Sequence, residues 1–169
     1  MIAIGIDPGL SGALAFIAAG RVAIEDIPTI DLPGKGLVRR RVDGLALTQL
    51  VRKHAPVGSA VIVCCEAVGV MGGQNNAVQT QGSLMRTLGA LEAIFDALRW
   101  PCVMVQAQAW QRHYGLQGKK HQRAAGEKPA AIFKALQLYP EAAAELARVK
   151  DHNRAEALLI ARYGLDTLA

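Results

Sequence analysis

The sequence predicts an α/β protein whose mixed five-stranded sheet is flanked by helices. Three short apolar segments near the N-terminus are separated only by tight turns, which is typical of antiparallel strands. Two later strands alternate with helical segments, as parallel strands covered by helices do. The strands are expected at residues 2–7, 12–18, 21–27, 59–65 and 102–106. No internal repeat, linker or break in composition divides the chain, so residues 1–169 are predicted to form one domain.

The first strand supplies the first candidate functional residue. Ile2, Ile4 and Ile6 alternate with small residues and give the strand one apolar face. Asp7 stands at the end of this strand, directly before a turn that begins with Pro8. Burying an unpaired carboxylate costs several kcal/mol, so Asp7 is expected to meet a metal ion, a cation or a phosphate-linked partner.

The helices follow from apolar residues at helical spacing. A long helix at 79–99 carries Leu84, Leu88, Leu91 and Phe95 on one side. Asp43 can cap an earlier helix that continues to about His54. The other helices are expected at 107–114, at 127–138 and from about Asn153 to Tyr163, with Gly164 as the stop. Irregular loops are expected between Pro28 and Arg41, over 67–78 and over 115–123, and Trp110 on its short helix is expected to belong to the core.

Composition indicates a globular protein with a polyanionic partner. Hydrophobic residues make up 51% of the 169 positions and charged residues 20%, which excludes a disordered chain. Nineteen Lys and Arg against 14 Asp and Glu give a net charge of +5, and this favours nucleic acid as a partner. A mildly basic protein without such a partner has the same composition.

Cysteine usage and hydropathy predict the compartment. Cys64 and Cys65 are adjacent in an apolar strand and Cys102 begins another, a pattern typical of buried thiols in a reducing compartment and not of a disulfide framework. The N-terminus has no positively charged leader, and no apolar stretch approaches the roughly 20 residues that cross a bilayer. We therefore expect a soluble cytoplasmic protein without a membrane partner.

Four acidic residues share a structural context. Asp7 and Glu66 each follow a strand, and Asp151 and Glu156 flank the start of the last helix. Ligands of open α/β sheets collect outside strand ends, so these carboxylates can converge there. Hard cations such as Mg²⁺ prefer oxygen ligands, and two such ions about 4 Å apart can activate water for phosphodiester hydrolysis. Each acid taken alone is as readily a solvated residue or a helix cap.

Three blocks in order along the chain resemble a known family. Gly5-Ile6-Asp7-Pro8-Gly9 with Gly12-Ala13, Glu66 after an apolar strand, and Arg154–Ala161 are similar to RuvC-type Holliday junction resolvases of the ribonuclease-H-like superfamily. A Gly-rich helix like Gly82–Gly89 and a segment like Pro101–Trp110 resemble the phage-encoded branch. The resemblance implies a homodimeric, Mg²⁺-dependent endonuclease, with Mn²⁺ able to substitute, that cuts four-way junctions symmetrically in a bacterial or phage-infected cell.

The resemblance also assigns roles to the acids. Asp7, Glu66 and Glu156 would hold the metals, and Asp151 is the candidate for the fourth ligand, with His152 as the alternative. The family usually has Asp or His three residues before the final acid, where this chain has Asn153. Asn153 and Glu156 also fit an Asn-x-x-Glu helix cap.

Basic and loop residues are the candidates for DNA binding. Phosphate contacts from such residues supply affinity without sequence information, although a charged run is more often a solvated surface. Gly69, Val70 and Met71 follow the second acid, where some relatives carry an aromatic wedge. A Met or Val there can enter a base step, and a flexible loop in which Met71 is incidental is the alternative. The candidates are Arg39, Arg40, Arg41, Met71, Gln74, Lys119, Lys120, Arg123 and Lys128.

The predicted function is that of a structure-selective endonuclease that resolves Holliday junctions and other branched DNA. An RNA-processing nuclease would use the same acids, and a non-catalytic junction-binding protein would not need them. An actin-like phosphotransferase also begins with an Asp-Gly strand turn, but it requires two such domains. The dimer is expected to form through the helix at 79–99, because Met85, Leu88, Ile94 and Phe95 exceed what one sheet face needs.

Overall fold

The computed structural model describes residues 1–33, 40–69, 78–117 and 129–169 and contains the predicted five-stranded mixed sheet. Its strand order is β3-β2-β1-β6-β7. The central strand β1 pairs antiparallel with β2 and parallel with β6, and β7 continues the parallel half. The strands are β1 (Ile2–Asp7), β2 (Ala13–Ala18), β3 (Arg21–Asp26), β6 (Val61–Ala67) and β7 (Cys102–Gln106). The predicted fold class is confirmed.

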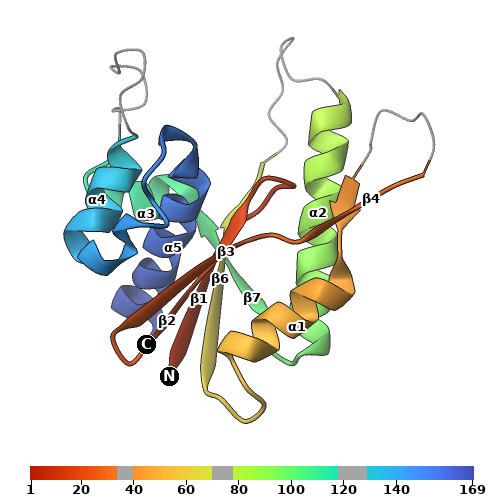
Figure 1. The fold of residues 1–169 in the computed structure, drawn as a ribbon, viewed down its shortest axis with the longest axis horizontal. Coiled ribbons are helices and arrows are strands. Elements are labelled where there is room, and N and C mark those ends of the chain that lie inside the picture. The colour runs from red at the N-terminus through yellow and green to blue at the C-terminus, as the bar shows by residue number, and fades with distance from the viewer. Residues whose placement is uncertain (34–39, 70–77, 118–128) are drawn as a thin grey trace.

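Helices cover both faces of this sheet (Figure 1). One face carries α3, α4 and α5, and the other carries α1 and α2. The helices are α1 (Gly44–His54), α2 (Val78–Ala97), α3 (Ala107–His113), α4 (Ala130–Leu138) and α5 (His152–Leu168), with short 3₁₀ turns η2 (Pro140–Ala143) and η3 (Val149–Asp151) between α4 and α5. Both long helices, α2 and α5, therefore lie against the same sheet from opposite sides.

Asp43 and the first hairpin show how local sequence sets these elements. The Asp43 carboxylate accepts hydrogen bonds from the backbone N–H groups of Leu45 and Ala46, at 3.1 and 3.0 Å, so the predicted cap of α1 is confirmed. Ala19 and Gly20 both have positive φ, 47° and 76°, which matches the twist of a two-residue hairpin turn between β2 and β3.

Alternation along β1 gives the two faces of the sheet different packing. Ala3 belongs to the core under α5, whereas Ile4 and Ile6 belong to the core under α1 and α2. Successive side chains of a strand point to opposite faces, so Gly5 and Asp7 share the α5 face with Ala3. Small residues therefore line β1 wherever α5 crosses it.

These small residues bring the α5 backbone onto the sheet. A Cβ added to Gly5 would collide with the Ala157 carbonyl oxygen and the Ala161 amide nitrogen. A Cβ on Gly164 would lie 2.6 Å from the Cys64 sulfur. The expectation that Gly164 ends the helix was wrong: α5 continues to Leu168, and Gly164 is there because its neighbour on β6 leaves no room for a side chain.

A small second sheet lies in the region that was expected to be an irregular loop. β4 (Thr29–Asp31) and β5 (Arg40–Val42) pair antiparallel, with Ile30 opposite Arg41. The expectation was wrong for these residues because Val42 is buried against the α1 and α2 core and anchors a strand that is otherwise basic. Arg39 lies outside the described residues.

The remaining core predictions can be compared directly. Trp110 is 1% exposed and belongs to the core, as expected. Cys64 and Cys65 are buried free thiols, and burial raises the pKa of Cys64 to about 11, so it packs as a neutral group. Phe95 is fully buried on the sheet side of α2, and Leu88 and Ile94 pack partly against the same core. Phe95 is thus not available as the subunit contact that was expected of it.

Two further points concern helix limits and membranes. α4 begins at Ala130, after Pro129, while residues 127 and 128 of the predicted helix lie outside the described residues. Within the described parts of the chain, none of the helices has both the length and the apolar character that a membrane crossing requires.

Candidate active site

Three of the predicted acids meet at one end of the sheet. Asp7 ends β1, and Glu66 lies near the end of the neighbouring strand β6. Ala3 and Gly5 precede Asp7 on the α5 face, and Ile62 and Cys64 precede Glu66 there, so alternation directs both carboxylates toward α5. Glu156 is in the second turn of α5 and comes to them from that helix.

The geometry of this acidic cluster (Asp7, Glu66 and Glu156) fits a divalent cation. One carboxylate oxygen from each residue lies within 4.8 Å of the other two, and all three residues are half-buried. Oxygens bound to one Mg²⁺ at 2.0–2.1 Å can be at most about 4.2 Å apart, so the observed spacing needs little adjustment. Three carboxylates held this close repel one another, and a bound cation would offset that repulsion.

The turn after Asp7 is tied to the start of α5. Within the turn, the Gly12 N–H donates to the Gly9 carbonyl at 3.1 Å. The Asn153 side-chain amide donates to the Ser11 carbonyl at 2.6 Å, and Asn153 precedes Glu156 by one helical turn. Asn153 lies inside the helix and not at its cap, so the capping interpretation was wrong, and its contact with the β1–β2 turn was not foreseen.

Asp151, the predicted fourth ligand, is not part of the acidic cluster in this structure. It is only 3% exposed, and its carboxylate forms an ion pair with Arg148 at 2.7 Å. The backbone N–H of Arg148 donates to the same carboxylate, also at 2.7 Å. Burial by itself would raise the pKa of Asp151, but the hydrogen bonds from Arg148 outweigh it and lower that pKa. His152, the alternative ligand, is exposed and likewise outside the cluster.

A second ion pair braces α5 against the sheet edge. The Arg154 guanidinium donates to both carboxylate oxygens of Asp26, at 2.6 and 2.7 Å, and Asp26 ends β3. The hydrogen bonds from Arg154 lower the pKa of Asp26. The sequence analysis named Arg154 only as part of a block that resembles the family. Its position close to a predicted metal ligand could have indicated a role at the site.

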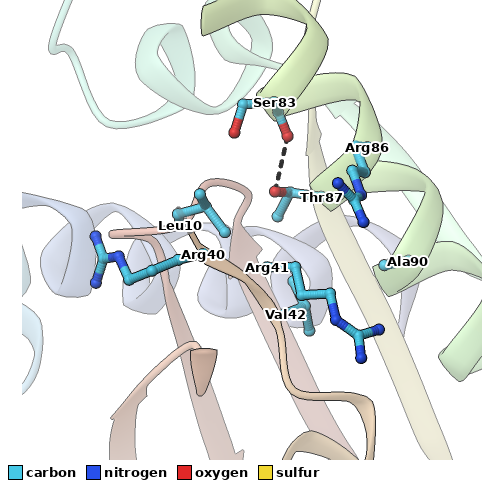
Figure 2. Close-up of a pocket in the computed structure, with 8 residues that line it drawn as sticks. All are labelled: Leu10, Arg40, Arg41, Val42, Ser83, Arg86, Thr87 and Ala90. Atoms are coloured by element: carbon cyan, nitrogen blue, oxygen red, sulfur yellow. Dashed lines mark hydrogen bonds between the residues drawn. The ribbon is translucent and has the colours of Figure 1, made fainter. Parts of the chain in front are cut away.

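Two basic pockets adjoin the turn after Asp7. The smaller, here called the α2 pocket, has a volume of about 90 Å³ and lies between β5, α2 and Leu10 (Figure 2). The larger, called the α5 pocket, has a volume of about 470 Å³ and is lined by the end of β3 and the start of α5. The basic residues of the α2 pocket are Arg40, Arg41 and Arg86, and those of the α5 pocket are Arg40, Arg148, Lys150, His152 and Arg154.

The predicted DNA contacts divide accordingly. Arg40 and Arg41 lie on β5 at these pockets, and Arg86, which joins them from α2, was missed because it stands alone in an apolar helix. The other candidates, Arg39, Met71, Gln74, Lys119, Lys120, Arg123 and Lys128, lie outside the described residues.

The sheet and its flanking helices have a fold similar to that of solved RuvC structures. The solved structures that the chain resembles include a RuvC of T. thermophilus "in complex with Holliday junction substrate", with a TM-score of 0.56 and 14% identity over 99% of this chain and 96% of that one. A second Thermus thermophilus RuvC structure gives a TM-score of 0.50 and 17% identity over 98% and 96%. No family model matches the sequence, and no curated protein matches it closely enough to count as a relative. The predicted likeness to RuvC structures is thus confirmed at the level of the fold.

Proposed function

We propose that this protein is a structure-selective endonuclease that cuts branched DNA, chiefly four-way junctions, by metal-dependent phosphodiester hydrolysis. The observation that carries the proposal is the convergence of Asp7, Glu66 and Glu156 from two adjacent strands and a helix. The RuvC-type fold adds support, since one of the similar structures is that of a RuvC bound to a Holliday junction.

We assign the metal site to the three residues of the acidic cluster. Their oxygen atoms suit Mg²⁺, and Mn²⁺ should substitute because it accepts the same ligands. Two ions bound there would activate a water molecule and neutralise the charge that develops on the phosphate. Asp151 is left out of this ligand set because Arg148 already binds its carboxylate.

Residues around the cluster position these ligands. Gly5 allows α5 to lie against β1, which sets the depth of Glu156 relative to Asp7. The Asn153–Ser11 hydrogen bond and the Arg154–Asp26 ion pair fix the first turns of α5 to one end of the β1–β3 meander, where Ala13 pairs with Asp26. The ligands thus come from elements that are held together before any metal binds.

The proposal is tested with a mobile synthetic four-way junction, with the cut positions mapped in the presence and absence of Mg²⁺. Asp7→Asn keeps the shape of the side chain but removes one negative charge, so cleavage should fall by orders of magnitude. Junction binding should persist or tighten, because repulsion of the phosphate is reduced. Asp96→Asn, an exposed change at the end of α2, serves as the matched control and should cut like the wild type. Near-normal cleavage by the Asp7→Asn variant would refute the proposal.

The same junction made of RNA separates the proposed activity from RNA processing. Preferential cutting of structured RNA would assign the acidic cluster to a different substrate. Binding of the DNA junction by the wild type without cleavage in either Mg²⁺ or Mn²⁺ would indicate a junction-binding protein.

We also propose that the active form is a homodimer. Two coordinated cuts across a two-fold junction require two active sites related by a two-fold axis, which an isologous dimer supplies. The half-buried residues Met85, Leu88 and Ile94 leave α2 some apolar surface for such a contact. Sedimentation velocity at micromolar concentration, with and without junction DNA, should show the dimer, and a monomer under both conditions would contradict it.

A further inference from the structure

Leu10 stands between the two basic pockets. It lies at the tip of the β1–β2 turn, three residues after Asp7, and it lines both the α2 pocket and the α5 pocket. Among the described residues, the two linings share one more, Arg40. Figure 2 shows Leu10 beside Ser83 and Thr87 of α2, with the Arg40 guanidinium pointing away from those of Arg41 and Arg86. An apolar side chain therefore separates two positively charged hollows.

The α2 pocket carries uncompensated charge. Arg40, Arg41 and Arg86 are all exposed, and none of them forms an ion pair with any acid in the described parts of the chain. Guanidinium groups bind phosphate oxygens with paired hydrogen bonds, so those of Arg41 and Arg86, which lie on the same side of this small hollow, suit a backbone phosphate.

The α5 pocket carries charge that is largely compensated. Arg148 is paired with Asp151, and Arg154 is paired with Asp26. Lys150 has no ion pair with a described residue and is exposed. This pocket is about five times larger than the α2 pocket, at about 470 against 90 Å³, and its net positive charge is smaller. It suits a wider and more weakly held segment of the same polyanion.

Both pockets are lined by Leu10, which the chain connects to the acidic cluster. Leu10 is linked to Asp7 through a turn that a hydrogen bond closes and that Asn153 holds to α5. Asp151 and Asn153 line the α5 pocket, and Glu156 follows Asn153 by one helical turn on the same helix. Leu10 and the α5 pocket are thus connected through the chain to two residues of the acidic cluster, Asp7 and Glu156.

We propose that Leu10 is a ridge that separates two DNA strands where they diverge at a branch. The α2 pocket holds a backbone phosphate of one strand, and the α5 pocket holds the strand that leaves in the other direction. Leu10 contacts the exposed base or sugar between them, as apolar side chains do at unstacked steps. In linear duplex DNA no strand diverges at this point, so only the α2 pocket is fully used. The inference rests on the proposed function and specifies how that site recognises a branch.

The test measures binding without cleavage, by fluorescence anisotropy in EDTA over a range of salt concentrations. The probes are a four-way DNA junction, a linear duplex that contains the sequence of two of its arms, and the same junction made of RNA. The variants are the double change Arg41→Ala with Arg86→Ala, the single change Lys150→Ala and the single change Leu10→Ala. Arg21→Ala, at the opposite end of the sheet, and Leu168→Ala, at the far end of α5, are the matched controls.

Each variant has its own expected pattern. The double arginine variant should bind both DNAs at least about tenfold more weakly and lower the salt slope by about two. Lys150→Ala and Leu10→Ala should weaken junction binding several-fold and leave duplex binding within about twofold. The two controls should bind both probes like the wild type.

Several outcomes would overturn the proposal. The double arginine variant could bind both DNAs as tightly as Arg21→Ala does, or Leu10→Ala could lose equal affinity for junction and duplex. The wild type could bind the DNA junction no more tightly than the duplex, or it could bind the RNA junction more tightly than the DNA junction. A wild type that binds in the expected pattern but does not cut would leave this inference standing and refute only the nuclease activity. Circular dichroism melting of each variant separates lost binding from lost folding.

Discussion

The two long helices on either side of the Asp7 turn differ in how they meet the sheet and in what they do with charge. α5 lies against β1 and β6 through residues with little or no side chain, Gly5, Ala157 and Gly164 among them. α2 meets the sheet through large side chains such as Leu91 and Phe95, both fully buried. Backbone-on-backbone packing fixes position closely, whereas side-chain packing tolerates adjustment.

The regions around the two helices also differ in whether their positive charges are paired with acids. At the start of α5, Arg148 and Arg154 each bind a carboxylate, so acidic residues of the protein neutralise their positive charges. Arg86 of α2 and Arg41 of β5 have no ion-pair partner among the described residues. The α5 side is thus the part that fixes the position of Glu156 in the acidic cluster, and the α2 side is the part whose charge has no acidic partner among the described residues.

The largest effect is expected where α5 touches β1. Gly5→Ala places a Cβ against the Ala157 carbonyl and the Ala161 amide, and backbone atoms cannot rotate out of the way. Unfolding free energy should fall by about 1–3 kcal/mol or more, as for other overpacked cores. Urea unfolding measures it, and cleavage should fall as well because Glu156 is displaced. A fully stable, fully active variant would mean that α5 is not fixed by this contact.

The next effect concerns the buried carboxylate at the start of α5. Arg148→Ala removes the partner of Asp151, so the thermal midpoint should fall at pH 7. The pKa of Asp151 is lowered in the folded state, so its ion pair stabilises the protein above the ordinary carboxyl pKa of about 3.9, and this stabilisation is lost as the pH falls through the lowered value. The difference from the wild type should therefore be full above about pH 5 and shrink below about pH 4.

Lys150→Ala, which removes a neighbouring charge that has no ion pair with a described residue, is the control for that experiment. Its thermal midpoint should follow that of the wild type at every pH. A difference for Arg148→Ala that stays constant down to pH 2 would show that the stabilisation does not depend on the charge of Asp151.

The sheet and its order of elements were predictable because their signals are local. Alternation in β1, the turn at Ala19 and Gly20, and the apolar run before Glu66 each need only a few neighbouring residues. The β4–β5 pair escaped notice because Arg40 and Arg41 give a three-residue strand no apolar alternation. Only the burial of Val42 against α2 identifies it, and that contact joins residues far apart in the sequence.

The residues of the candidate site were likewise only partly predictable from the sequence. Asp7, Glu66 and Glu156 were predicted from strand ends and the family-like blocks, and the structure brings them together. Asp151 was expected among them because the sequence alone does not distinguish an aspartate that binds a metal from an aspartate that pairs with an arginine. Arg148, three residues earlier, is the signal that separates the two cases. Gly164 was ambiguous for a similar reason, since a helix stop and a close approach to Cys64 both require glycine.

A smaller effect is expected from the hydrogen bond that ties the Asp7 turn to α5. Asn153→Ala should reduce the unfolding free energy by only about 1 kcal/mol, since it removes one hydrogen bond at a half-buried position. Cleavage should fall about 10- to 100-fold, with a higher Mg²⁺ requirement, because residues that orient metal ligands have effects of that size. Junction affinity in EDTA should not change. Thr167→Ala, which removes an exposed hydrogen bond near the end of α5, should leave cleavage unaltered.

The smallest effect is expected on α2. A Cβ added to Gly89 meets no atom of the described residues within 4 Å, in contrast to Gly5, and Gly89 is exposed in the middle of a helix. Gly89→Ala should therefore raise the unfolding free energy by about 0.5–1 kcal/mol, because alanine loses less conformational freedom than glycine when a helix forms. The gain should be the same at low and high protein concentration if this face of α2 is open to solvent. A loss of stability that grows with protein concentration would instead show that a second subunit approaches Gly89 too closely to admit a methyl group, and would place the dimer contact on this face of α2.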